Sequence, residues 1–161
     1  MKRWTMAMSL GVAPFVALLI VACSTGPVRR VSEPAANIQQ LTVRADGSWS
    51  LELRIDNFST VPMRFETLSL AMTISGQSAG TLQAKPGLSI GPESADVATV
   101  GFVPLSAAKI VIADALARNA SVNYTLEGTL DAAPQKGSVH SYKLKRENAL
   151  SPVPGVAGVL R

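Results

Sequence analysis

The residues of this chain best suited to covalent chemistry lie near its amino terminus, around the single cysteine. The tetrapeptide Ile20-Val21-Ala22-Cys23 ends an uncharged apolar run, and Lys2 and Arg3 precede that run as a positive segment. A positive segment, a short apolar segment and a small-residue cleavage site together make a secretory signal peptide. The sequence therefore predicts a signal peptide over residues 1–22, cut immediately before Cys23.

This tetrapeptide resembles the lipobox of bacterial lipoprotein precursors. The resemblance implies that Cys23 becomes the first mature residue and carries thioether-linked diacylglycerol and an N-acyl chain, so that it is the lipid-anchor residue. Each buried CH₂ contributes about 0.8 kcal/mol of membrane affinity, so these chains hold the protein firmly. Ser24 stands where lipoproteins retained in the inner membrane usually have Asp. It favours a place in the cell envelope on the periplasmic face of the outer membrane.

A transmembrane helix is the alternative for residues 5–22. The apolar stretch is at the short limit of what crosses a bilayer. It contains Gly11 and Pro14 and has no basic cluster directly after it. These features favour the signal peptide.

The composition offers little for catalysis. With Cys23 acylated no thiol remains, which leaves no disulfide, no cysteine nucleophile and no thiolate metal site. The single histidine, His140, shares its alternation with Tyr142 and Leu144 and is interpreted as a structural strand residue. Nucleophilic catalysis needs an activated nucleophile, a base and an orienting group. We therefore expect no enzyme, no cofactor and no metal site.

Cleavage of the signal peptide lowers the positive charge. Lys2 and Arg3 leave, so 13 basic residues stand against 11 acidic ones and the formal net charge falls from +4 to +2. The basic pI is thus partly a property of the signal peptide, and no nucleic acid is expected as a partner. Arg29 and Arg30 are interpreted as solvated linker charges, with contact to anionic headgroups as the alternative.

A second group of cations gathers near the last predicted strand. Its members are Lys136, Lys143, Lys145 and Arg146. Lysines guard edge strands against pairing with neighbouring chains. Edge protection is the preferred interpretation, and a patch for lipid A phosphates or anionic lipid is the alternative.

The elements that follow Cys23 divide the chain into four parts. They are a signal peptide (1–22), a lipidated amino terminus with a flexible tether (23–35), a folded domain (36–147) and a loose carboxy-terminal tail (148–161). Pro27 and Pro34 resist both helix and central strand, which indicates the tether. From Asn148 onward the chain has prolines and glycines without polar alternation, which indicates the tail.

Within the domain, apolar residues alternate with polar ones. The two clearest core faces are Trp49, Leu51, Leu53 and Ile55, and Leu68, Leu70, Met72 and Ile74. Such alternation predicts half-buried strands. One helix is expected over residues 106–117, with Ser106 as its N-cap and Asn119 closing it. The sequence predicts a mainly β protein, an immunoglobulin- or fibronectin-like antiparallel β-sandwich of about seven strands with one short helix.

The order of these elements suggests a family. A strand ends in Asp56-Asn57-Phe58, Pro62 follows closely, and Val122-Asn123-Tyr124-Thr125-Leu126-Glu127-Gly128-Thr129-Leu130 comes after the helix. The pattern resembles the late embryogenesis abundant type 2 family, the water-stress-and-hypersensitive-response domain, over residues 36–146. The family usually has Asn-Pro-Asn after the early strand, and Asn57 alone corresponds to it here. Without the family, Asp56 and Asn57 are expected to cap the strand end with side-chain hydrogen bonds, and Gly128 is an ordinary strand residue.

The resemblance implies a non-enzymatic role in desiccation or osmotic stress. The expected partners are a membrane, through lipidated Cys23, and weak contacts with proteins or lipids. Two alternatives stay open. An adaptor in envelope assembly or secretion would capture a partner strand at a bare, flat sheet edge. A carrier of an apolar small molecule would have a cavity lined by Leu53, Leu70 and Ile112.

Overall fold

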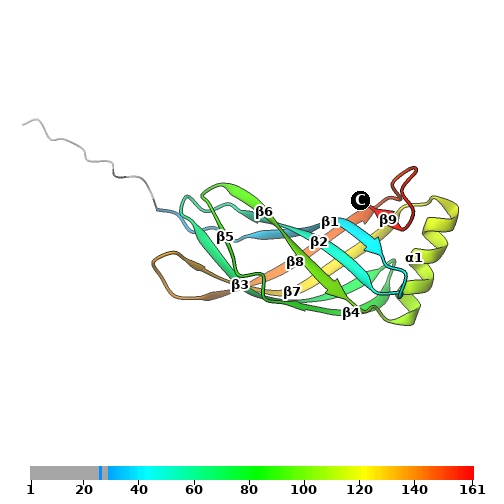
Figure 1. Cartoon of the computed structure of the whole chain (residues 1–161). Coiled ribbons are helices and arrows are strands. Elements are labelled where there is room, and N and C mark those ends of the chain that lie inside the picture. The colour runs from blue at the N-terminus through cyan, green and yellow to red at the C-terminus, as the bar shows by residue number, and fades with distance from the viewer. Residues whose placement is uncertain (1–25, 27–28) are drawn as a thin grey trace, which may run out of the picture.

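The computed structural model describes Gly26 and residues 29–161, and these form nine strands and one helix. In chain order the elements are β1 (Ala35–Val43), β2 (Trp49–Asn57), β3 (Met63–Ile74), β4 (Gln77–Ala84), β5 (Leu88–Ile90), β6 (Ser94–Phe102), α1 (Ser106–Arg118), β7 (Val122–Pro134), β8 (His140–Leu150) and β9 (Val159–Leu160). Figure 1 shows an elongated body, with the amino-terminal segment entering at one end and α1 covering the other.

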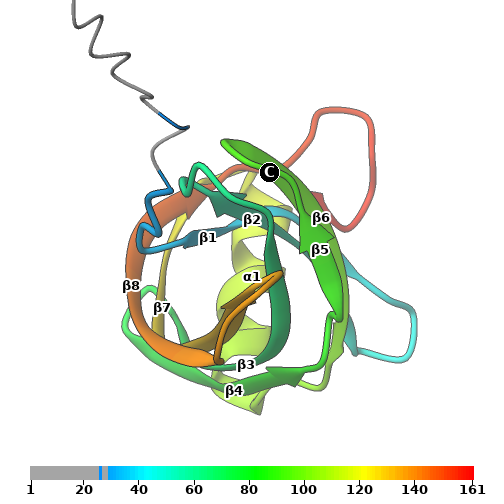
Figure 2. The ribbon, with the colours of Figure 1, turned by 90° about the vertical axis from the view of Figure 1, so that its left-hand side faces the viewer.

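The strands form two antiparallel sheets. One has the order β6-β2-β1-β9, and the other has the order β4-β3-β7-β8 with β5 also paired to β3. Viewed along the long axis, the two sheets curl around a common interior (Figure 2). The predicted mainly β, two-sheet sandwich with one short helix is confirmed. The short strands β5 and β9 were not expected from the sequence.

Both predicted core faces are buried. Trp49, Leu51, Leu53 and Ile55 of β2 and Leu68, Leu70, Met72 and Ile74 of β3 are each at most 3 % exposed. The ring of Trp49 lies 6.1 Å from that of Phe102, tilted by 57°. Because alternate residues of a strand point to opposite faces, the period-2 pattern was sufficient to identify this core.

Three register shifts interrupt the alternation, one of them between β3 and β4 at Met72 and Thr73. The β1–β2 register shifts between Ile38 and Gln40, and the β3–β7 register shifts between Phe65 and Thr67. Each bulge adds a residue on one strand. As a result Ile38 is buried together with Leu41, three positions later, which a strict period of two does not produce.

Two residues of β7 join the strands in ways that the sequence did not reveal. The hydroxyl of Tyr124 accepts a hydrogen bond from the backbone N–H of Ile38 (3.1 Å), which links the two sheets. Burial of this hydroxyl raises the pKa of Tyr124.

Gly128 was predicted to be an ordinary strand residue, and this is wrong. A Cβ at this position would lie 2.1 Å from the backbone oxygen of Ser69, so the close approach of β3 and β7 requires glycine.

The helix is confirmed, but its predicted N-cap is wrong. Leu105 occupies the N-cap position without a side-chain hydrogen bond, and Ser106 is the first helical residue. Asn119 closes the helix as predicted, in the left-handed conformation (φ 53°), with its N–H bonded to the carbonyls of Ala115 and Leu116. The short polar side chain of asparagine tolerates this conformation.

The predicted loose tail is also wrong. Strand β8 continues to Leu150, and β9 returns to pair with β1 through Leu41 and Leu160. Leu160 is fully buried, and Ser151 and Arg161 exchange two backbone hydrogen bonds of 2.6 and 2.8 Å. A single buried leucine near the end of the chain carries no periodic signal, so only its position against β1 reveals that it belongs to the core.

Candidate functional site

The residue predicted to carry chemistry, Cys23, lies outside the described residues, as do the signal peptide and Ser24. Lipidation of Cys23 therefore stays a prediction. Within Gly26 and residues 29–161, no helix has the length and hydropathy needed to cross a membrane. The stretch that begins at Arg29 shows instead where the chain joins the domain.

The last residues of the predicted tether are bound to the domain. The backbone N–H of Arg30 donates to Oγ1 of Thr60 (2.8 Å), and the N–H of Thr60 donates to the carbonyl of Arg30 (3.0 Å). The N–H of Ser32 donates to Oγ of Ser59 (3.0 Å). The flexible tether predicted over 23–35 therefore needs a correction. Arg30 to Ser32 are fixed, because the hydroxyl groups of the β2–β3 loop bind their backbone.

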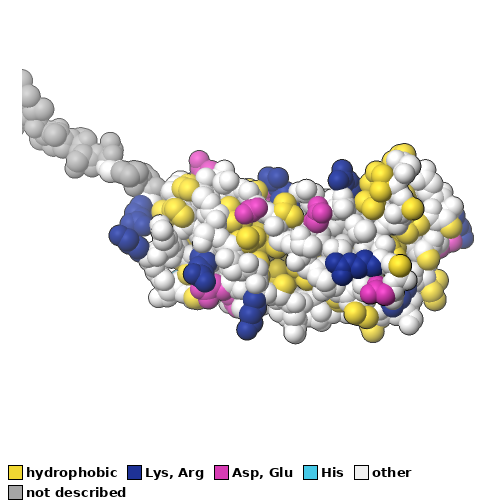
Figure 3. All heavy atoms as spheres, viewed as in Figure 1, with side chains coloured by type: hydrophobic (Ala, Val, Ile, Leu, Met, Phe, Trp, Pro, Cys, Tyr) yellow, Lys and Arg dark blue, Asp and Glu magenta, His cyan; other side chains and the backbone are white. Residues whose placement is uncertain are grey.

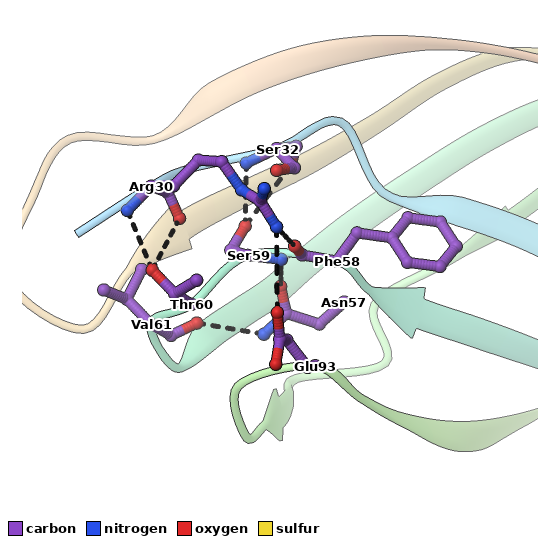
Figure 4. Close-up of polar contacts among 8 residues, drawn as sticks. All are labelled: Arg30, Ser32, Asn57, Phe58, Ser59, Thr60, Val61 and Glu93. Carbon is purple, nitrogen blue, oxygen red and sulfur yellow. Dashed lines mark hydrogen bonds and ion pairs between the residues drawn. The ribbon is translucent and has the colours of Figure 1, made fainter. Parts of the chain in front are cut away.

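Asn57 organises the loop that receives this segment (Figure 4). It is 1 % exposed, and its Nδ2 donates toward the carbonyls of Val61 (3.0 Å), Ile90 (3.2 Å) and Gly91 (2.7 Å). Its Oδ1 accepts from the N–H of Ser59 (3.0 Å). Of the side-chain capping predicted for Asp56 and Asn57, the part at Asn57 is confirmed, whereas the carboxylate of Asp56 accepts from Nε of Arg54 (2.9 Å). The reach of Asn57 to the β5–β6 connection is a tertiary feature that the sequence did not indicate.

Four segments meet at this end of the sandwich. Besides the Arg30–Thr60 contact, the N–H of Glu93 donates to the carbonyl of Ser59 (3.0 Å), and that of Gln135 to the carbonyl of Pro62 (3.1 Å). We call this surface the tether end and define it as residues 29–32, 58–62, 91–93 and 135–139. Arg30 also forms an ion pair with Glu93 (3.7 Å). These amides, hydroxyls and carbonyls hold loops together. Among the described residues, no group of three or more His, Cys, Asp or Glu is placed to hold a metal ion.

Replacing Asn57 with alanine should destabilise the domain by about 2–4 kcal/mol, because it leaves buried carbonyls without a donor. Urea melts followed by the fluorescence of Trp49 measure this change. Asn123→Ala, at an exposed position of β7, is the matched control and should change stability by less than about 0.5 kcal/mol. Equal effects of the two substitutions would show that the Asn57 amide does not stabilise the loops.

The remaining candidates of the sequence lie on β8, an edge strand of its sheet. His140 is exposed, with its ring 6.4 Å from that of Tyr142. Lys145 lies near Glu127 (3.9 Å) and Glu147 (3.8 Å). Arg146 hydrogen-bonds Asn37 of the other sheet. Lys136 is separate from these cations, in the β7–β8 loop at the tether end. Exposed charges on an edge strand hinder its pairing with a strand of another chain, so their position on β8 agrees with edge protection.

On two of the edge strands, β6 and β8, a side chain satisfies the backbone donor of the next residue. On β6, Oδ1 of Asp96 accepts from the N–H of Val97 (2.8 Å). On β8, Oδ1 of Asn148 accepts from the N–H of Ala149 (2.9 Å). A partner strand adds to a sheet through main-chain hydrogen bonds. Each contact occupies one donor of its edge, and the adaptor alternative stays a prediction.

Among the described residues, the most exposed large apolar side chains lie at the opposite end. They are Val103 (75 % exposed), Ile110 (70 %) and Leu105 (54 %), on the β6–α1 connection and on α1. The inner face of α1 buries Ala108 and Ile112, so Ile110 points away from the core. Apolar side chains are visible at this end in Figure 3. We call Val103, Leu105 and Ile110 the α1-end patch.

The position of Leu53, Leu70 and Ile112 bears on the carrier alternative. All three are at most 1 % exposed and belong to one packed core. The hollows found on the described residues open at the surface, and these three side chains line none of them. One such hollow, of about 430 Å³, includes Thr67 and Asp131. The hydrogen bond from the Thr67 hydroxyl lowers the pKa of Asp131.

No protein-family model matches the chain, and no curated protein matches it in sequence. Solved structures of similar shape do exist. A protein from Archaeoglobus fulgidus is 12 % identical over 77 % of this chain and 98 % of its own, with a TM-score of 0.45. The protein AT1g01470 from Arabidopsis thaliana is 11 % identical over 78 % of this chain and 82 % of its own, with a TM-score of 0.49.

A third similar structure is the Northeast Structural Genomics Consortium target SoR45. It is 13 % identical over 79 % of this chain and 92 % of its own, with a TM-score of 0.48. At these identities and scores the likeness assigns no activity, ligand or partner to this chain. The resemblance to the late embryogenesis abundant type 2 family stays a prediction from the sequence.

Proposed function

We propose that this protein is a lipid-anchored envelope protein of the late embryogenesis abundant type 2 kind, which protects by binding or shielding and without catalysis. The observation that carries the proposal is that the two ends of the domain differ. The chain enters at the tether end, a few residues after the predicted lipid anchor Cys23. The most exposed large apolar side chains, in the α1-end patch, lie at the opposite end.

This difference between the two ends indicates how the proposed protection works. An anchor at one end places the α1-end patch away from the membrane that holds the protein. Scattered exposed apolar residues are normal, but a group at one end of a domain is typical of an interaction surface. In the proposal, the patch makes weak contacts with apolar surfaces that other proteins expose as water is lost.

The filled core also supports shielding over transport. Thirty buried apolar side chains form one cluster, and in the described part of the chain no buried side-chain nitrogen or oxygen lacks a hydrogen-bond partner. Such a domain needs neither a metal nor a disulfide for stability. We therefore expect it to survive dehydration and rehydration itself.

Deletion of the gene should lower survival after drying or hyperosmotic shock and leave growth in rich medium normal. The purified mature protein should limit aggregation of a dried test enzyme more than an equal mass of an unrelated sandwich domain.

Ile110→Lys should weaken this protection of the test enzyme, because it places a charge in the α1-end patch. Val139→Lys, at the tether end, is the matched control and should protect as well as the wild type in this assay, which contains no membrane.

Unchanged survival after drying, together with a defect in secretion or envelope assembly, would replace this proposal with the adaptor alternative. Equal protection by Ile110→Lys and the wild type would remove the α1-end patch from the mechanism.

A further inference from the structure

We propose that the tether end is a docking surface for an anionic phospholipid bilayer, so that the domain rests on the membrane with α1 pointing away from it. This proposal rests on the proposed lipid anchor at Cys23. It goes further, because an anchor alone would leave the domain free to turn on its tether. The argument depends on chain length, charge and exposed apolar side chains.

Chain length places the tether end near the membrane. Residues 24–28 separate Cys23 from Arg29. An extended chain spans at most about 3.3–3.6 Å per residue, so this end lies within about 20 Å of the anchored cysteine. Arg30 and Ser32 are hydrogen-bonded to the β2–β3 loop. The domain is therefore held close to the bilayer by this end and by no other described segment.

The charge of the tether end is complementary to an anionic surface. Its four segments contain the cations Arg29, Arg30 and Lys136 and one acidic residue, Glu93. Their net charge of +2 equals that of the whole chain from Cys23 onward, so the rest of the domain is neutral on balance. The side chain of Arg30 stays 60 % exposed despite its ion pair with Glu93. Basic groups close to a membrane are attracted to anionic headgroups within about one Debye length, roughly 8–10 Å.

Exposed apolar side chains accompany these cations. Val31 and Val139 are 47 % and 51 % exposed and come from two of the four segments. Phe58 is also half exposed, but its ring points back along β2, away from the Arg30–Thr60 contact (Figure 4). Apolar and basic side chains on one surface are the combination that binds at a membrane interface. The apolar residues enter the headgroup boundary, and the cations contact the phosphates. The α1-end patch has exposed apolar residues too, but it lies at the end remote from the anchor.

Tryptophan fluorescence in vesicles tests this orientation. The lipidated mature protein, which starts at Cys23, is reconstituted into phosphatidylglycerol-containing vesicles whose acyl chains are brominated, because bromine quenches tryptophan that reaches the headgroup boundary. Val139→Trp places a probe at the tether end, and Ile110→Trp is the matched probe on α1. Trp49 is buried in both variants and is subtracted with the wild type. We expect about twofold quenching of the Val139→Trp probe, since interfacial side chains lie only about 5–10 Å deep, and none of the Ile110→Trp probe.

A charge exchange tests the electrostatic part. Arg29→Glu with Lys136→Glu should abolish quenching of the Val139→Trp probe, and so should replacing phosphatidylglycerol with phosphatidylcholine. Arg44→Glu with Arg118→Glu makes the same change of charge near α1 and should leave quenching intact. Equal quenching of the two probes, or quenching insensitive to both changes, would overturn the docking surface. Failure of the wild type to float with vesicles would instead overturn the lipid anchor and, with it, the docking that depends on it.

Discussion

A Cys23→Ser variant should incorporate no radiolabelled palmitate, whereas the wild type is labelled. A cysteine sulfur reacts as the thiolate, and a serine hydroxyl is a much weaker nucleophile at neutral pH. Cys23 is the sole cysteine of the chain, so no second thiol can take its place. The expected loss is complete, and the variant should accumulate as an unlipidated precursor.

Ser24→Ala is the control for this experiment. It changes the adjacent residue and keeps the thiol, so its labelling should match that of the wild type. Equal labelling of Cys23→Ser and the wild type would refute the lipid anchor. It would also return residues 5–22 to the alternative of a transmembrane helix.

Leu53→Asp should unfold the domain. Leu53 is fully buried in the middle of β2. An unpaired carboxylate there costs several kcal/mol, which is a large part of the roughly 5–15 kcal/mol that stabilises a domain of this size. Urea melts followed by Trp49 fluorescence measure the loss, because Trp49 is 1 % exposed in the same strand and lies against Phe102.

Glu52→Ala is the matched control, one residue earlier on the opposite face of β2. Glu52 is half-buried and pairs in register with Thr99 of β6. Its truncation should change the free energy of unfolding by less than about 1 kcal/mol. Similar melts for the two variants would mean that the assigned faces of β2 are wrong.

Much of the fold was predictable because its signals are local. The alternation in β2 and β3 follows from the strand period of two, which any half-buried strand must show. The helix closed at Asn119 for a local reason too, since asparagine tolerates the left-handed conformation. The bulges in β1 and β3 were not predictable, because an extra residue is defined by the partner strand it fails to match.

The same distinction applies to the candidate sites. The sequence by itself predicts a lipobox around Cys23 and a domain without catalytic residues, and both stay predictions. It also determined the capping role of Asn57, which the structure confirms. Each of these depends on neighbouring residues. Only the tertiary structure decided that Asn57 reaches Ile90, that Gly128 must be glycine and that Leu160 completes the core. It also decided that Arg30 and Ser32 bind the β2–β3 loop and that Arg30 pairs with Glu93. These are contacts between residues far apart in the chain, and no local pattern of side chains encodes them.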